Sequence, residues 1–461
     1  MAGATIAAFL APRGIKIALI DRSFSEKSRI VGELLQPGAV VTLEKMGLGH
    51  LLEGFDAQKV KGYALFQGEN EITVPYNRDQ HTDYHGMGLH NGRFLQKIRA
   101  CALQNETVTQ FEGKATELIE DENQVVSGIK FKAKDGNQHV IRAKLTITSD
   151  GFFSNFRKNL SKNKKKVTSF FIGLLLKDCA LPYPGYGHVF LSGPTPFICY
   201  PVSTDEVRVL VDFPGDKPPK REAIMHHLQH NVSPFIPSKM REQYELVVQA
   251  QNFKIMPNHY MAAKPILKEG AVLLGDSLNM RHPLTGGGIT AVFSDVYLLG
   301  SHLMAMRDFS DKNLINEKVE RYYRDRQPAN ANVNILANAL YGVMSNDLLK
   351  EAVFKYISKG GDCAQEPISL LAGLNKSHKT LIKQFFSVAY CGVTGLLREN
   401  LRNVPAAFRV VWDALIIIKP LIKNELLLAS FYFYRPGKIN SISVPERETE
   451  RSLRTTISPS K

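Results

Sequence analysis

The stretch Gly275-Asp-Ser-Leu-Asn-Met-Arg-His-Pro-Leu-Thr-Gly-Gly-Gly288, directly after the apolar run Ala271–Leu274, decides the fold of this chain. We expect a short buried strand, an acidic residue (Asp276), a polar turn, and a helix from Ile289 to Leu299 that the three glycines open. Glycines at a helix start let backbone N–H groups approach a ligand closely, and the helix dipole adds partial positive charge there. Asp276 can accept a hydroxyl of a sugar or ribityl chain.

An ordinary strand–loop–helix connection has the same order of elements, and Gly275-Asp276 alone does not distinguish the two interpretations. The whole fourteen-residue run is more specific, and three further segments accompany it. These are Arg29-Ile-Val-Gly-Glu-Leu-Leu-Gln-Pro-Gly38 after the pair Asp21-Arg22, Asp150-Gly151 before Phe156-Arg157, and Cys199-Tyr-Pro201 before Arg208-Val-Leu-Val-Asp212. Together they resemble the squalene monooxygenase (squalene epoxidase) family of class A flavoprotein monooxygenases, from Gly3 to roughly Tyr390.

The resemblance implies an α/β fold in which a Rossmann-type FAD-binding domain is interleaved with a β-sheet substrate domain, followed by a C-terminal helical, membrane-associated region. We expect two FAD-binding parts at 1–160 and 263–345, a substrate-binding sheet at 161–262, a helical region at 346–435 and a polar tail at 436–461. The pattern agrees with this division, because apolar runs alternate with polar residues through 168–255 and helical periodicity covers 311–358.

The N-terminal segment is typical of the second half of a Rossmann βαβ unit. Ala7–Ala11 has a helical pattern, Gly14 is a break, and Ile15–Ile20 is a buried strand that ends at Asp21. Gly3 matches the last glycine of G-x-G-x-x-G, but the first strand and the first two glycines are missing. We therefore interpret Met1 as an internal methionine. We expect a gap or displaced strand beside Ile15–Ile20, an open phosphate site, and poor solubility without bound flavin on expression from Met1.

The resemblance implies FAD as cofactor and NADPH as an indirect electron source through a separate reductase. The acidic and arginine positions would hold the adenosine, phosphates and ribityl chain, and the others would offer backbone groups. The FAD-binding positions carried over are Asp21, Arg22, Arg29, Arg93, Ala115, Asp150, Asp276, Gly286, Gly287, Gly288 and Ile289. In isolation, each arginine is equally compatible with a surface charge, and Asp150-Gly151 with a structural turn.

Flavin monooxygenases depend on neither a nucleophile triad nor a metal, and we expect no metal site. A flavin hydroperoxide delivers electrophilic oxygen to an alkene, while the protein binds, orients and excludes water. The resemblance implies squalene as substrate and 2,3-oxidosqualene as product. It places a tyrosine important for activity at Tyr63, whose phenol we expect to hydrogen-bond a flavin-side residue such as Gln36. A core tyrosine is the alternative.

The hydrocarbon pocket is expected to lie between the flavin-binding turn and the C-terminal helices. The residues expected to line it are Pro283, Leu284, Phe354, Tyr356, Phe385 and Phe386. Simple core packing is the alternative for each aromatic residue. The family often has a histidine directly before the Phe-Phe pair, whereas this chain has Gln384, which leaves the far end of the pocket undetermined.

The composition narrows the class of partner. The chain has 461 residues, a formal net charge of +14, and five cysteines without a CxxC pair, which indicates a reducing compartment and no zinc site or disulfide framework. The densest basic run, Lys158–Lys166, has five lysines in nine residues and no interleaved aromatic residues, so we expect no nucleic-acid partner. A solvated loop is the plain interpretation, and anionic lipid or an acidic reductase is the functional one.

The C-terminal region predicts contact with a membrane. Ala406–Tyr434 is strongly apolar but is interrupted by charged residues and Pro420, so it contains no uninterrupted apolar stretch of ~20 residues. We expect two amphipathic helices that meet near Pro420 and lie in a bilayer interface; two core helices are the alternative. The family implies monotopic contact with membrane lipid at the cytosolic face of the endoplasmic reticulum.

Two other functions remain open. The chain as written could be an inactive remnant that cannot hold FAD, because its first strand is missing. It could also be a related FAD-dependent hydroxylase of another apolar substrate. No pattern in the sequence indicates the oligomeric state.

Overall fold

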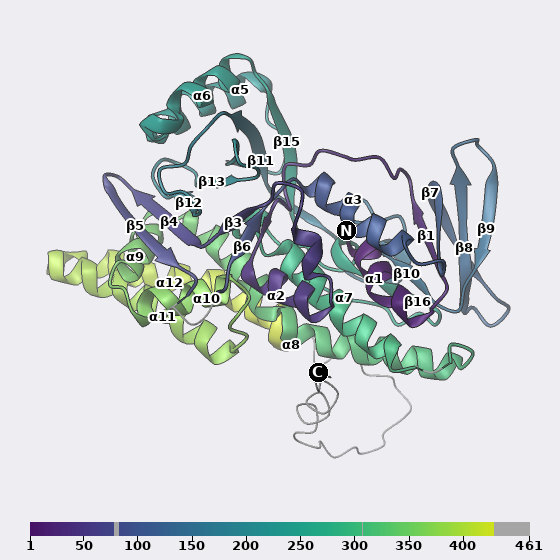
Figure 1. Ribbon diagram of the computed structural model, residues 1–461. Helices are drawn as coiled ribbons and strands as arrows, with labels where there is room; N and C mark the ends of the chain where they lie inside the picture. The colour runs from purple at the N-terminus through teal and green to yellow at the C-terminus, as the bar shows by residue number, and fades with distance from the viewer. Residues whose placement is uncertain (78–82, 307, 428–461) are drawn as a thin grey trace, which may run out of the picture.

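The computed structural model describes residues 1–77, 83–306 and 308–427. Figure 1 shows the predicted mixed α/β fold, with the strands β7–β9 at one end and the helices α9–α12 at the other. The long helix α8 (Lys312–Met344) runs along the lower side of the molecule between these two ends.

The nucleotide-binding part begins with the helix, break and strand expected from the sequence. Helix α1 (Ala2–Leu10) is followed by Gly14 at φ +73° and by strand β1 (Ile17–Asp21). Strand β1 pairs in parallel with β7 (Val108–Glu120), a single long strand with register shifts against its other neighbour. Antiparallel β8 (Val126–Ala133) and β9 (Gln138–Arg142) complete this sheet, with a hairpin at Asp135-Gly136 between them.

The chain returns to this part at Ala271, as expected. Strand β10 (Thr146–Thr148) pairs in parallel with β16 (Ala271–Leu273). Within the described residues, no strand pairs with the other edge of β1 or of β10. The N-terminal turn of α1 lies there: a Cβ on Gly3 would be 2.6 Å from Ser149 Oγ and 4.0 Å from Leu19 Cδ1.

The substrate part is a seven-stranded sheet with the order β15-β11-β14-β13-β12-β4-β5. It contains the strands expected within 168–255 and also recruits two strands from 62–75, so the interleaving goes further than the sequence suggested. Helices α5 (Arg221–His226) and α6 (Ser238–Gln249) pack on it (Figure 1). The strands are β4 (Gly62–Gln67), β5 (Asn70–Pro75), β11 (Lys166–Lys177), β12 (Gly187–Phe190), β13 (Phe197–Pro201), β14 (Glu206–Pro214) and β15 (Phe253–Tyr260).

A small three-stranded sheet and three helices connect the two parts. The sheet has the order β2-β6-β3. These elements are β2 (Leu34–Leu35), β3 (Gln58–Val60), β6 (Gly86–Gly88), α2 (Pro37–Lys45), α3 (Asn91–Leu103) and α4 (Arg157–Leu160).

The C-terminal region is helical, but one expectation about it is wrong. Instead of two helices that meet near Pro420, a single helix α12 (Val404–Ile422) contains Pro420 and then widens into a π-helical turn, Lys423–Leu427. Proline lacks an N–H group, and its ring clashes with the carbonyl of the residue four positions earlier, so a proline inside a helix weakens or kinks the helix. The other helices are α9 (Asp347–Ile357), α10 (Asp362–Leu371) and α11 (His378–Glu399). Phe431–Tyr434 and the tail 436–461 lie outside the described residues.

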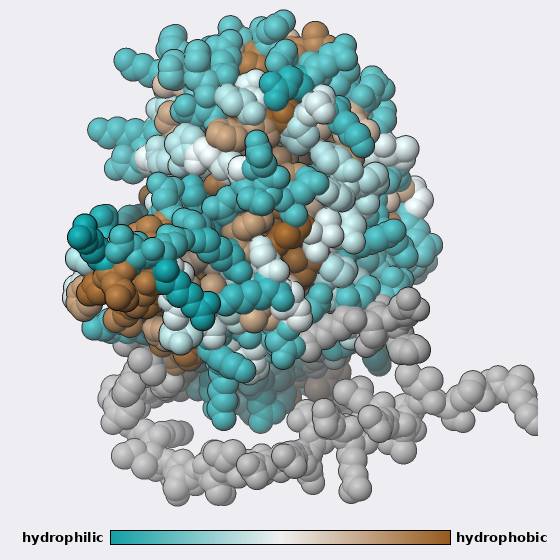
Figure 2. All heavy atoms as spheres, turned by 90° about the vertical axis from the view of Figure 1, so that its left-hand side faces the viewer, coloured by the Kyte–Doolittle hydropathy of each residue, from teal (hydrophilic) through white to brown (hydrophobic). Residues whose placement is uncertain are grey.

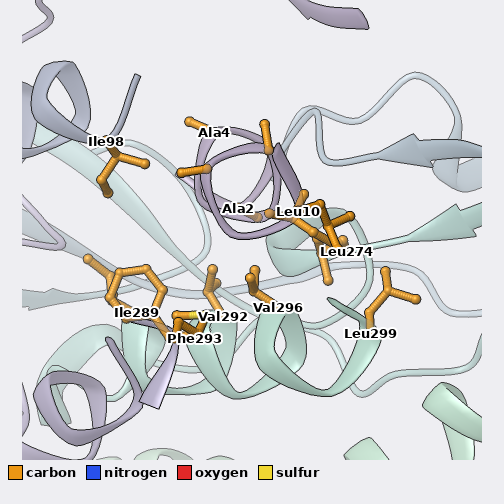
Figure 3. Packing of buried hydrophobic residues seen from close by; sticks show 14 of the residues in the cluster. Ala2, Ala4, Leu10, Ile98, Leu274, Ile289, Val292, Phe293, Val296 and Leu299 are labelled. Atoms are coloured by element: carbon orange, nitrogen blue, oxygen red, sulfur yellow. The ribbon is translucent and has the colours of Figure 1, made fainter. Parts of the chain in front are cut away.

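The core of the nucleotide part forms where α1 packs on α7 (Gly288–Met304), as Figure 3 shows. Small side chains on α1, such as Ala4 and Ala8, let the two helices approach closely. Phe293 of α7 is fully buried there, and its ring centroid lies 6.3 Å from that of Phe94 on α3. This packing holds the glycine-rich start of α7 beside the start of α1.

Phe293→Ala should lower the free energy of unfolding by about 3–5 kcal/mol, because it leaves a cavity between α1, α3 and α7. Denaturant titration of the detergent-solubilised protein measures this loss. Leu246 on α6 is 53% exposed, and Leu246→Ala should change stability by less than about 0.5 kcal/mol. Equal losses for both variants would contradict this account of the core.

Candidate cofactor and substrate site

Charged residues from separate segments lie around the N-terminal end of α1. The amino group of Met1 is buried there, and burial together with Arg29 lowers its pKa to about 6, while Asp21 and Asp276 act in the opposite direction. The structure therefore brings Asp21, Arg29 and Asp276 together, as the sequence predicted. A helix N-terminus surrounded by arginines is suited to an anionic group such as a pyrophosphate.

Arg99 is a member of this group that the sequence analysis missed. Its Nη2 donates to Asp21 Oδ2 at 2.6 Å, and its buried Nη1 has no acceptor among the described residues. A buried donor without an acceptor is costly, so this nitrogen is suited to an oxygen atom of a bound ligand. Arg99 lies on α3 two turns after Arg93, and it was missed because its partner Asp21 is 78 residues away in the sequence.

Arg157 joins the two acidic segments of the site. Its guanidinium donates to the carbonyl oxygens of Gly151 (2.8 Å), Phe152 (3.0 Å), Asp276 (2.9 Å) and Ser277 (2.9 Å). The turn after β10 and the turn after β16 are thus held side by side. The Asp150 and Asp276 side chains are both exposed, and Asp150 Oδ2 accepts from the backbone N–H of Asn155 at 2.8 Å.

The three glycines at the start of α7 differ in their surroundings. A Cβ on Gly286, which has φ +64°, would lie 3.0 Å from Gln36 Nε2, and a Cβ on Gly287 would lie 2.6 Å from Val333. A Cβ on Gly288 would have no heavy atom within 4 Å. The first two glycines therefore permit close packing within the protein, whereas Gly288 leaves open space at the helix start, where a ligand can approach the backbone. The residues present fit a dinucleotide cofactor.

A large apolar cavity begins at the same turn. It has about 1320 Å³ of empty space, part of it open to solvent. Leu284 and Thr285 of the turn line one wall, and Phe385 and Gln384 of α11 line another. The remaining lining residues are nearly all aliphatic, so the cavity is suited to a long hydrocarbon.

Two of the six predicted pocket residues, Leu284 and Phe385, line this cavity. The other four do not. Phe354 is buried in the hydrophobic cluster behind the cavity wall, and Phe386 is 40% exposed because consecutive residues of a helix point in different directions. Tyr356 acts indirectly: its hydroxyl donates to Oε1 of the cavity residue Gln384 at 2.7 Å.

Pro283 is the fourth residue that lies off the cavity wall. It occupies the first position of the one-turn helix Pro283–Thr285, where its fixed φ suits the turn.

Gln36 lies at the centre of a polar cluster beside the cavity. Its Nε2 donates to the carbonyl of Thr285 at 2.7 Å and also to the hydroxyl of Tyr63, while its Oε1 accepts from the Tyr76 hydroxyl at 3.1 Å. The predicted Tyr63–Gln36 hydrogen bond is confirmed. A carbonyl can only accept, so Thr285 fixes the orientation of the amide. Burial raises the pKa of Tyr63 above its ordinary value, and the phenol stays neutral.

A buried ion pair lies next to this cluster. Arg208 of β14 donates to Glu33 Oε2 at 2.6 Å through Nε and to Oε1 at 3.2 Å through Nη2. Burial raises the pKa of Glu33, and the hydrogen bond from Arg208 opposes this shift. Glu33 precedes β2, so the pair fixes the substrate sheet against the flavin-side segment.

A family model described as squalene epoxidase matches residues 142–408. Squalene epoxidase 3 of Arabidopsis thaliana is 40% identical over 463 residues, which cover 97% of this chain and 88% of that protein. Squalene monooxygenase of Mus musculus is 33% identical over 439 residues, which cover 92% of this chain and 76% of that protein.

The chain belongs to the squalene epoxidase family. Solved structures agree with the fold. A probable FAD-dependent monooxygenase from Pseudomonas aeruginosa, PqsL, has a TM-score of 0.61 at 18% identity, over 77% of this chain and 96% of that one. A flavoprotein/dehydrogenase from Cytophaga hutchinsonii has a TM-score of 0.65 at 16% identity, over 87% of this chain and 98% of that one.

The roles of three further FAD-binding positions stay predictions. Arg22 is exposed after β1. Arg93 is exposed in the first turn of α3 and lies near Asp56. Ala115 is on β7, opposite Phe131 of β8.

Proposed function

We propose that this protein is an FAD-dependent monooxygenase that epoxidises squalene to 2,3-oxidosqualene. The observation that carries the proposal is the shared turn: Leu284 and Thr285 line the apolar cavity, and the next three residues are the glycines at the start of α7. A hydrocarbon in the cavity and a flavin at the glycines would meet at this turn. Family membership favours squalene over the aromatic substrates of a hydroxylase and favours an active enzyme over a remnant.

The cofactor would lie between α1 and α7. Asp21, Arg29, Arg99 and Asp276 would hold its adenosine, phosphate and ribityl groups, because they surround the start of α1. FAD, when bound and reduced, supplies an electrophilic oxygen atom from O₂ to the alkene. Electrons would come from NADPH through a separate reductase, as is expected for this family.

The chain's own contribution to the reaction is binding, orientation and exclusion of water. Aliphatic side chains bury the hydrocarbon, and polar groups are few, with Thr285 and Tyr63 at the flavin-side turn and Gln384 on the α11 wall. Tyr63 lines the cavity, and its hydroxyl oxygen accepts a hydrogen bond from Gln36 Nε2. The hydroxyl hydrogen of Tyr63 is therefore not used in this contact. That hydrogen would be donated to an oxygen atom at the flavin side of the cavity.

The C-terminal helices would place the enzyme on the cytosolic face of the endoplasmic reticulum membrane. Helix α11 is long and apolar enough to cross a membrane, and 22% of its apolar window is buried. On α12, Phe408 and Trp412 are 70% and 57% exposed, and basic residues such as Arg409 accompany them. Figure 2 views this end of the molecule and shows an apolar area bordered by hydrophilic side chains. Monotopic contact with lipid explains why large apolar side chains stay uncovered.

The function is tested with microsomal protein that is given squalene, FAD, NADPH and a reductase, and 2,3-oxidosqualene should form in an oxygen-dependent reaction. Asp276→Ala should raise the FAD concentration for half-maximal activity by about one to two decades, because a hydrogen bond to a charged group contributes roughly 1.5–3 kcal/mol. Asp216 is exposed in a distant loop, and Asp216→Ala is the matched control without effect. Turnover of phenols without turnover of squalene would sink the proposal.

Tyr63→Phe should lower kcat about tenfold, which corresponds to roughly 1.4 kcal/mol, because the hydroxyl next to Gln36 is lost. Tyr76 also binds Gln36 but does not line the cavity, so Tyr76→Phe serves as the matched variant and should cost less than threefold. Steady-state product formation measures both effects. A larger loss for Tyr76→Phe than for Tyr63→Phe would mean that Tyr63 only packs the core.

The double variant Phe408→Ser, Trp412→Ser should move protein from the lipid fraction to the soluble fraction in liposome flotation, because these residues form the apolar face of α12. Val140 on β9 is 52% exposed at the opposite end of the molecule, and Val140→Ser should float like the parent. Unchanged flotation of the double variant would assign α12 to the core rather than to a membrane surface.

A further inference from the structure

His282 lies within the fourteen-residue run but has no role in the function described so far. It is fully buried between the seven-stranded sheet and α8. Its ring stacks on Tyr341 of α8, with centroids 3.9 Å apart at 13°, and Phe171 of β11 meets it edge-on at 5.6 Å. Its backbone N–H donates to Asn338 Oδ1 at 3.4 Å. The ring is therefore held on both faces.

Polar groups of three neighbouring strands hold one edge of the ring. Ser169 of β11 donates to Asp212 Oδ1 of β14 at 2.5 Å, and Asn258 Nδ2 of β15 donates to Ser169 Oγ at 2.9 Å. The remaining lone pair of Ser169 lies 2.9 Å from His282 Nε2. The serine hydroxyl has one hydrogen and two lone pairs, so His282 must be the donor in this contact, with its hydrogen on Nε2.

The other ring nitrogen faces the flavin-side turn. His282 Nδ1 accepts from the backbone N–H of Leu284 at 3.3 Å. This nitrogen carries no hydrogen, so the ring is neutral, and burial lowers the pKa of His282 in agreement with that state. A side-chain acceptor for the N–H group two residues ahead is the geometry of an Asx turn.

Serine, histidine and aspartate together suggest a hydrolytic triad, but their arrangement excludes one. In a triad the histidine lies between serine and aspartate and uses both nitrogens. Here Asp212 binds Ser169 directly, the second nitrogen faces Leu284, and Ser169 is fully buried. The cluster therefore supports the turn through His282 and does not provide a nucleophile.

The turn that His282 sets carries two functional elements. Leu284 and Thr285 line the cavity, and the carbonyl of Thr285 orients the Gln36 amide at 2.7 Å. A change in the turn would move the cavity wall and Gln36 together, and with Gln36 the hydrogen-bond partner of Tyr63.

We propose that His282 is a positioning residue: Ser169 and Asp212 of the substrate sheet hold its ring, and its Nδ1 fixes the turn Pro283–Thr285 that orients Gln36 and Tyr63 beside the flavin. This couples the substrate sheet to the cofactor-binding turn through a single side chain. The expected effect of His282 on squalene turnover rests on the proposed function. The expected effect on the backbone of residues 283–285 does not.

Two substitutions test the roles of the two ring nitrogens separately. In His282→Asn the amide oxygen takes the place of Nδ1 and preserves the contact to Leu284, whereas in His282→Gln the polar group reaches Ser169 and the contact to Leu284 is lost. Hydrogen exchange of the peptide 283–289 should rise about three- to tenfold in His282→Gln, as expected for one lost hydrogen bond, and less than twofold in His282→Asn. In squalene turnover, kcat should fall about tenfold in His282→Gln with a smaller change in KM, and His282→Asn should recover at least a third of the parent value.

His302 on α7 binds Asp325 at 2.8 Å and is partly exposed, so His302→Gln is the matched control without effect on either readout. Equal exchange of 283–289 in the Asn and Gln variants would overturn the proposal, as would losses of kcat that follow melting temperature alone. If either variant does not fold, Ser169→Ala replaces it, and unchanged exchange of 283–289 there overturns the proposal. Absence of squalene turnover in the parent would refute the proposed function only, because the exchange comparison does not depend on it.

Discussion

The hydrogen bond from the Gln36 amide to the Thr285 carbonyl joins the parts of the molecule on which function depends. Gln36 precedes α2, and Thr285 precedes the glycines of α7. Of the two tyrosines that complete the cluster, Tyr63 lies on β4 and Tyr76 directly follows the edge strand β5. The carbonyl can only accept, so the amide has one orientation, and this orientation decides which tyrosine accepts and which donates. The contact thus sets the polar end of an otherwise apolar cavity.

Buried charges hold the interleaved parts in register around this contact. Glu33 and Arg208 are 1% and 4% exposed, and Asp295 and Arg326 are 1% and 4% exposed. Replacing such a pair with apolar residues is often neutral, but removal of one partner leaves an uncompensated charge and is strongly destabilising. Glu33 and Arg208 lie 175 residues apart in the sequence, whereas Asp295 and Arg326 join the consecutive helices α7 and α8. A shifted register would separate the charges of either pair. Arg157 does the same for the turns after β10 and β16 by using four carbonyl oxygens.

The sequence predicted the local elements and the parts of the site that lie next to them. The strand β16, its turn and α7 follow from apolar periodicity and glycines, and the Tyr63–Gln36 contact follows from the family resemblance. The sequence did not predict the roles of Arg99 and Arg157, because their acceptors come from distant segments and include backbone carbonyls, which leave no side-chain pattern. The cavity assignment failed for Phe354, Tyr356 and Phe386 because an apolar residue on a helix does not reveal which neighbour covers it. The single helix through Pro420 was missed because a proline can kink a helix without ending it, and the sequence alone does not show which of the two occurs.

The most direct test of the central claim is a structure of the FAD-loaded protein with a long, unreactive hydrocarbon bound. The account predicts the flavin ring against Gly288 and the Thr285 turn, the phosphates at the start of α1 near Arg29 and Arg99, and one end of the hydrocarbon at Leu284. A flavin ring bound away from the turn 283–288, or a hydrocarbon outside the cavity lined by Leu284 and Phe385, would contradict it.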